Sequence, residues 1–125
     1  MSLAALEAKI EKEVTTYNQL QKEYSKIVSG RQTLESQLKE NELVQTEFEL
    51  LDDEATIYKM IGPVLVKQEQ AEAKTNVKKR LDFIRSEINR AEKQIKDLDV
   101  KLEKKKVELM ALQTEFQKRK EAASA

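Results

Sequence analysis

The sequence predicts a mainly α fold: a long antiparallel two-helix coiled coil with one central β-hairpin that joins an intermolecular β-barrel. Three observations lead to this prediction. Charged residues make up 37% of the chain and aromatic residues only 5%, a composition typical of long helices rather than of a globular core. Apolar residues recur at alternating spacings of three and four. The only proline lies beside one of the two glycines near the midpoint, at Gly62-Pro63.

The first half is expected to form a helix over residues 1–52. Its apolar stripe follows a heptad through Leu3, Leu6, Ile10, Glu13, Tyr17, Leu20, Tyr24, Ile27, Arg31, Leu34 and Leu38. Only Glu13 and Arg31 are neither apolar nor aromatic. After Leu38 the stripe is expected to slip by one residue and to continue through Val44, Phe48 and Leu51, as a stutter would.

The second half is expected to form a helix over residues 69–121. Its stripe runs through Val77, Leu81, Ile84, Ile88, Ala91, Ile95, Leu98, Leu102, Lys105, Leu109, Leu112 and Phe116, with Lys105 as the exception. Two apolar sites in seven are typical of a coiled-coil seam. The two helices are of similar length, and Gly62-Pro63 argues against one continuous rod, so an antiparallel hairpin of helices is favoured.

The midpoint, "TIYKMIGPVLVKQ" (Thr56–Gln68), is rich in β-branched residues and predicts a β-hairpin over residues 55–67 that turns at Gly62-Pro63. A lone hairpin is marginally stable in water, and its free edges attract further strands. We therefore expect it to pair with hairpins of other chains, most simply in a closed barrel. The expected assembly residues are Ile57, Tyr58, Met60, Ile61, Val64, Leu65 and Val66. The alternative is a poorly ordered apolar loop.

Several classes of function find no support in the composition. The chain has no histidine and no cysteine, the usual general base, thiolate nucleophile and zinc ligands. No glycine-rich phosphate loop is present. We therefore expect no enzyme activity and no catalytic, metal or cofactor-binding residue. The formal net charge is zero and the basic clusters are short and scattered, so no nucleic-acid partner is expected. No stretch predicts a signal peptide or membrane span.

The whole chain resembles the β class of prefoldin subunits, within it the subunit 6 group of eukaryotes. The resemblance is carried by "IYKMIGPVLVKQEQAEA" (Ile57–Ala73), by "SGRQTLESQLKENELV" (Ser29–Val44) and by "KRLDFIRSEI" (Lys79–Ile88). The "GPVLVKQ" segment is its most specific part, whereas heptads are common to any coiled coil. The resemblance implies a single prefoldin β-type domain over residues 1–125.

The same resemblance implies a heterohexamer of two α-class and four β-class subunits, three of the latter being further β-class partners. Their hairpins would form a double β-barrel from which coiled-coil arms extend. The family acts without ATP as a holding chaperone in the cytoplasm. It captures nascent chains, above all actin and tubulin, and passes them to the cytosolic chaperonin.

In such an assembly the two chain ends would form an arm tip. The expected client-binding residues are Leu3, Leu6, Ile10, Leu109, Met110, Leu112 and Phe116. They would offer an adaptable apolar surface if the last turns separate. The alternative is that they merely complete the seam, although Met110 is off it. A second hypothesis for the whole chain is a structural coiled-coil tether that oligomerises through its hairpin.

Overall fold

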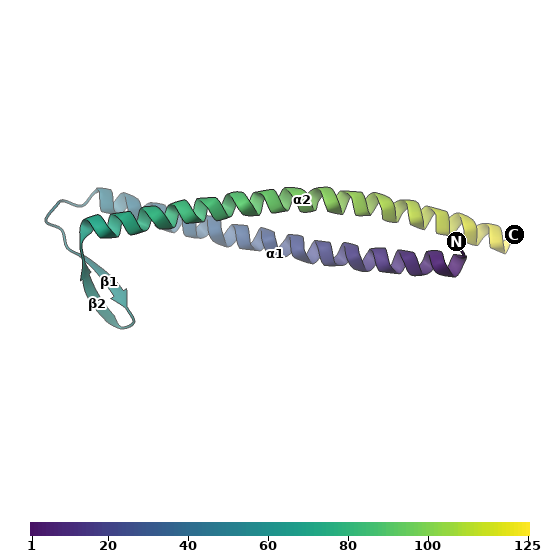
Figure 1. Ribbon diagram of the computed structural model, residues 1–125, viewed down its shortest axis with the longest axis horizontal. Coiled ribbons are helices and arrows are strands. Elements are labelled where there is room, and N and C mark those ends of the chain that lie inside the picture. Colours follow the sequence, from purple (N-terminus) through teal and green to yellow (C-terminus); the bar gives the residue numbers. More distant parts are fainter. The chain divides into compact units, whose positions relative to one another are not determined.

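The computed structural model describes all 125 residues and contains four elements. Helix α1 (Leu3–Glu49) is followed by strands β1 (Ile57–Ile61) and β2 (Val64–Gln68) and by helix α2 (Gln70–Ser124) (Figure 1). The predicted mainly α fold with a central antiparallel hairpin is confirmed. No helix combines the length and the apolar character needed to cross a bilayer.

The chain divides into two compact units. The first, here the terminal unit, comprises residues 1–29 and 92–125. Its two helical segments run antiparallel, because Glu13 pairs with Lys105 while the carbonyl of Met1 accepts a hydrogen bond from Arg119. Leu6, Leu98 and Leu109 are its buried side chains.

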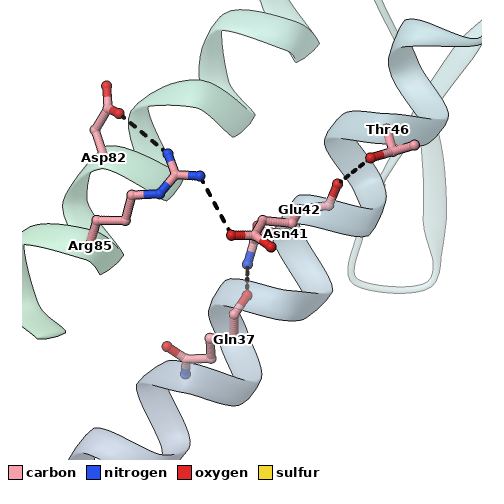
Figure 2. Close-up of polar contacts among 6 residues, drawn as sticks. All are labelled: Gln37, Asn41, Glu42, Thr46, Asp82 and Arg85. Carbon is pink, nitrogen blue, oxygen red and sulfur yellow. Dashed lines mark hydrogen bonds and ion pairs between the residues drawn. The ribbon is translucent and has the colours of Figure 1, made fainter.

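The second unit, here the central unit, comprises residues 30–91 and includes the hairpin. Its buried side chains all come from α2: Ala73, Val77, Leu81, Ile84, Ile88 and Ala91. Two polar contacts join the helices beside this stripe. Arg85 lies 3.5 Å from a Glu42 carboxylate oxygen, and Arg80 donates to Asn41 Oδ1 at 3.4 Å. Figure 2 shows Arg85 between Glu42 on α1 and Asp82 on α2.

The seam of α1 in the central unit does not slip as the sequence predicted. Leu38, Asn41, Gln45 and Phe48 are half-buried and keep the alternating spacing, whereas Val44 is 39% exposed. The predicted stutter was wrong at Val44, because the apolar Val44 was chosen over the polar Gln45. Phe48 and Leu51, the other two residues of the predicted stripe, are half-buried. Asn41 occupies its site with a satisfied amide, whose Nδ2 donates to the carbonyl of Gln37 at 2.7 Å (Figure 2).

Local hydrogen bonds set the ends of the helices. The hydroxyl of Ser2 accepts from the amide of Ala5 at 3.1 Å, which caps the start of α1. After α1 ends, Asp52 Oδ1 accepts from the amide of Glu54 at 3.1 Å, an arrangement typical of aspartate turns. Gln70 then donates to the carbonyls of Asp52 and Ala55 at 2.6 and 2.8 Å. These bonds fix the segment that leads into the hairpin.

Candidate functional site

The hairpin has a fully defined register. Its five antiparallel pairs run from Ile57 opposite Gln68 to Ile61 opposite Val64, and the turn holds only Gly62 and Pro63. Gly62 has a φ of 58°, which an L side chain rarely adopts. A positive φ at the first turn residue and the fixed negative φ of proline at the second match a type II′ turn. The dipeptide therefore determines both the position and the register of the hairpin.

The register assigns the side chains to two faces, because directly opposed residues share a face. One face, here the Tyr58 face, contains Tyr58, Met60, Leu65 and Lys67. The other, here the Lys59 face, contains Ile57, Lys59, Ile61, Val64, Val66 and Gln68. Each face is mainly apolar, so neither resembles the polar, solvent-facing side of an ordinary antiparallel sheet.

The chain itself leaves this apolar surface open. Of the seven predicted assembly side chains, Ile57 is half-buried, and the other six are between 43% and 69% exposed: Tyr58, Met60, Ile61, Val64, Leu65 and Val66. The sheet has two strands only, so both outer edges lack a backbone partner. Contiguous apolar surface with unpaired edges is typical of a protein interface.

The predicted client-binding residues all lie in the terminal unit, but most of them are not at its surface. Leu6 and Leu109 are 1% and 8% exposed. Leu3, Ile10, Leu112 and Phe116 are half-buried. Met110 alone is open, at 60% exposure. In this state six of the seven side chains complete the seam.

Two exposed residues near Met110 were not singled out from the sequence. Val100 and Val107 are 66% and 58% exposed and line a shallow hollow on α2. They are seven residues apart, and Met110 follows Val107 at a spacing of three, so the three side chains lie along one side of the helix. The signal in the sequence was an apolar pair at heptad spacing outside the predicted seam.

The two charged exceptions in the seam of the terminal unit are partners of each other. Lys105 Nζ lies 2.7 Å from Glu13 Oε2 and 3.5 Å from the carboxylate of Glu108. The hydrogen bond from Lys105 lowers the pKa of the Glu13 carboxyl, although partial burial opposes this effect. The same bond raises the pKa of Lys105. No group of three or more His, Cys, Asp or Glu side chains is arranged to hold a metal ion.

Comparison with known proteins decides the family. The profile described as "Prefoldin subunit" matches residues 11–116. The chain belongs to the prefoldin family. Prefoldin subunit 6 of Homo sapiens is 50% identical over 120 residues, which cover 96% of this chain and 92% of that protein. Prefoldin subunit 6 of Saccharomyces cerevisiae is 49% identical over 96 residues, which cover 77% of this chain and 84% of that protein.

Solved prefoldin structures show the same fold. The prefoldin beta2 subunit from Thermococcus strain KS-1 superposes with a TM-score of 0.63 at 28% identity, covering 74% of this chain and 98% of that one. The prefoldin beta subunit from the same strain gives a TM-score of 0.74 at 23% identity, covering 82% and 90%. The chain is thus a prefoldin subunit of the co-chaperone family, and its resemblance to the β class and to subunit 6 is confirmed.

Proposed function

We propose that this chain is one of four β-class subunits in a prefoldin heterohexamer, together with two α-class and three further β-class subunits. Residues 1–125 act as a single prefoldin β-type domain in the cytoplasm. The hairpin joins the barrel platform, and the helices form one of the arms. The observation that carries the proposal is the hairpin, whose six exposed apolar side chains and two open edges require other strands to cover them.

In the proposed function, the arm tip holds non-native proteins without ATP and without enzyme chemistry. Clients are nascent chains, above all actin and tubulin, which the complex delivers to the cytosolic chaperonin. Met110, Val100 and Val107 offer apolar contact surface directly. Leu3, Leu6, Ile10, Leu109, Leu112 and Phe116 become available when the ends of α1 and α2 separate. Weak apolar contacts at several tips act together, so no single tip needs high affinity.

The assembly step is tested by placing carboxylates on the open hairpin. Val64→Asp and Val66→Asp put charges on the Lys59 face at sites where the barrel would bury an apolar side chain. We expect both variants to be lost from the hexamer by native mass spectrometry, while far-UV circular dichroism shows unchanged helix content. The matched control is Val107→Asp. Val107 is a valine on α2 that is about as exposed as Val64, and this variant should enter the hexamer normally.

A hexamer that forms equally well with Val64→Asp and Val66→Asp would contradict the role of the hairpin. A homodimer, or a complex of the chain with one large partner, would instead favour the tether hypothesis. A tether also predicts no suppression of client aggregation, so a light-scattering assay with denatured actin separates the two functions.

The tip assignment is tested by removing residues 1–10 and 109–125 from the chain within the complex. The hairpin is untouched, so we expect normal assembly and a several-fold loss of aggregation suppression. A companion variant, Val100→Ser with Val107→Ser and Met110→Ser, leaves the seam intact and removes only the exposed stripe. Client capture that survives both changes would show that the client-binding surface lies elsewhere in the chain.

A further inference from the structure

The centre of strand β1 is occupied by a lysine on a mainly apolar surface. Lys59 is the third of the five residues of β1 and lies directly opposite Val66. It shares its face with Ile57, Ile61 and Val64. A barrel that covers this face takes the ammonium group away from water, which is unfavourable unless a carboxylate or other acceptor receives it.

The chain does not supply that acceptor. Residues 56–68 contain two lysines, Lys59 and Lys67, and no aspartate or glutamate. Glu69 and Glu72 border the same hollow as Lys59 at the start of α2, but neither forms one of the ion pairs within the chain. Lys59 is exposed.

A second copy of the hairpin cannot supply the acceptor either. If two β1 edges paired antiparallel in full register, Ile57 would face Ile61 and Lys59 would face Lys59 of the other copy. Like charges directly opposite each other destabilise a strand pair. If β1 instead paired with β2 of a second copy in the register of the hairpin itself, Lys59 would face Val66. A charged side chain pointing inward on an edge strand is a known means of preventing self-association.

We infer that the free edge of β1 pairs with a strand of a different subunit that carries a carboxylate opposite Lys59. This inference rests on the proposed assembly function and specifies its partner: an apolar hairpin with an aspartate or glutamate on the face that meets Lys59. The charge on Lys59 therefore contributes to the choice between unlike subunits and copies of the same chain. The backbone edge and the apolar side chains supply the rest of the interaction.

The direct test is zero-length carbodiimide cross-linking of the native complex, which joins an amine only to a carboxylate in contact with it. Peptide mass spectrometry should find Lys59 joined to an aspartate or glutamate in the hairpin of another subunit. A cross-link only to Glu69 or Glu72 of its own chain would overturn the inference.

The second test is a competition for incorporation. Tagged variant and untagged wild-type chains are expressed together with the other subunits, and their ratio in the hexamer is measured. Lys59→Glu should enter about tenfold less well than wild type, because it loses an attraction and gains a repulsion. Lys59→Arg should enter normally. The matched control is Lys67→Glu, which reverses the same charge on the Tyr58 face and should change incorporation less than twofold.

Self-association gives an independent measurement. The isolated Lys59→Met variant should form dimers at concentrations at least several-fold lower than wild type in sedimentation experiments, because the inward charge is gone. Equal incorporation of Lys59→Glu and wild type into an intact hexamer would overturn the inference and leave the proposed function standing. Failure of the wild-type chain itself to enter a hexamer would instead contradict the proposed function.

Discussion

At the scale of single residues, the exceptions to the seam pattern are as informative as the rule. The heptads identify Glu13 and Lys105 as charged residues in an apolar stripe, but nothing in either pattern shows that they meet. The structure places their charged atoms 2.7 Å apart, 92 residues apart in the sequence. The pairing of Lys105 with Glu13 shows which turn of α2 lies beside which turn of α1 in the terminal unit. A polar pair of this kind sets register at some cost in stability.

The Glu13–Lys105 pair predicts a defined pH dependence of stability. The pKa of Glu13 is lowered in the folded chain, so its contribution is complete above the ordinary value of 4.5 and disappears as the pH falls through the folded-state pKa. The pKa of Lys105 is raised, so its contribution is complete below 10.5 and disappears as the pH rises through the folded-state value. Glu13→Gln should therefore lower the thermal midpoint at pH 7, and this loss should become smaller as the pH is lowered below 4.5.

The control for this prediction is Glu11→Gln, which removes an exposed carboxylate from the same turn of α1. The thermal midpoint of both variants is compared with that of wild type by circular dichroism at each pH. A thermal midpoint at pH 7 that is the same for Glu13→Gln as for Glu11→Gln would show that the ion pair does not stabilise the terminal unit.

At the scale of elements, the sequence determines the hairpin more completely than the helices. Gly62-Pro63 fixes the turn, and the β-branched residues on both sides leave one register that pairs all five positions. The seam of α1 is less determined, since Val44 and Gln45 are adjacent and either could continue the stripe. Hydrophobicity favours Val44, but the structure buries Gln45 further, because continuous helical geometry keeps the earlier spacing. A stripe with polar members is recognised only when the partner helix is known.

The seam phase can be measured with two substitutions at these neighbouring positions. Gln45→Leu places an apolar side chain in the seam against α2 and should raise the free energy of unfolding by about 1 kcal/mol. Val44→Gln changes a side chain outside the seam and should alter it by less than about 0.5 kcal/mol. Urea denaturation followed by circular dichroism gives both values. Destabilisation by Val44→Gln of 1 kcal/mol or more would restore the stutter that the sequence suggested.

At the scale of the whole molecule, the chain combines self-sufficient helices with a hairpin that is incomplete alone. The sequence predicted both parts. The seven residues that it assigned to assembly lie on the two faces of the hairpin, and their role in assembly stays a prediction. For the tip, the sequence left two alternatives open, because a heptad pattern does not show whether the last turns are closed or open. The structure shows the closed one, with six of the seven tip residues in the seam and Met110 outside it. The identity of the strand that covers Lys59 is likewise a property of another chain.

Because the helices are complete within one chain and the hairpin is not, the two parts should differ in amide hydrogen exchange. In the isolated chain, the amides of residues 57–68 on the open edges should exchange rapidly, since a two-stranded sheet opens easily. In the assembled complex they should exchange at least about tenfold more slowly, because neighbouring strands accept the edge amides. The amides around Leu81 and Ile84, whose side chains are 0% and 4% exposed, belong to a completed helix and should change little. Equal protection of residues 57–68 in both states would mean that the hairpin is complete within one chain and does not need strands of other subunits.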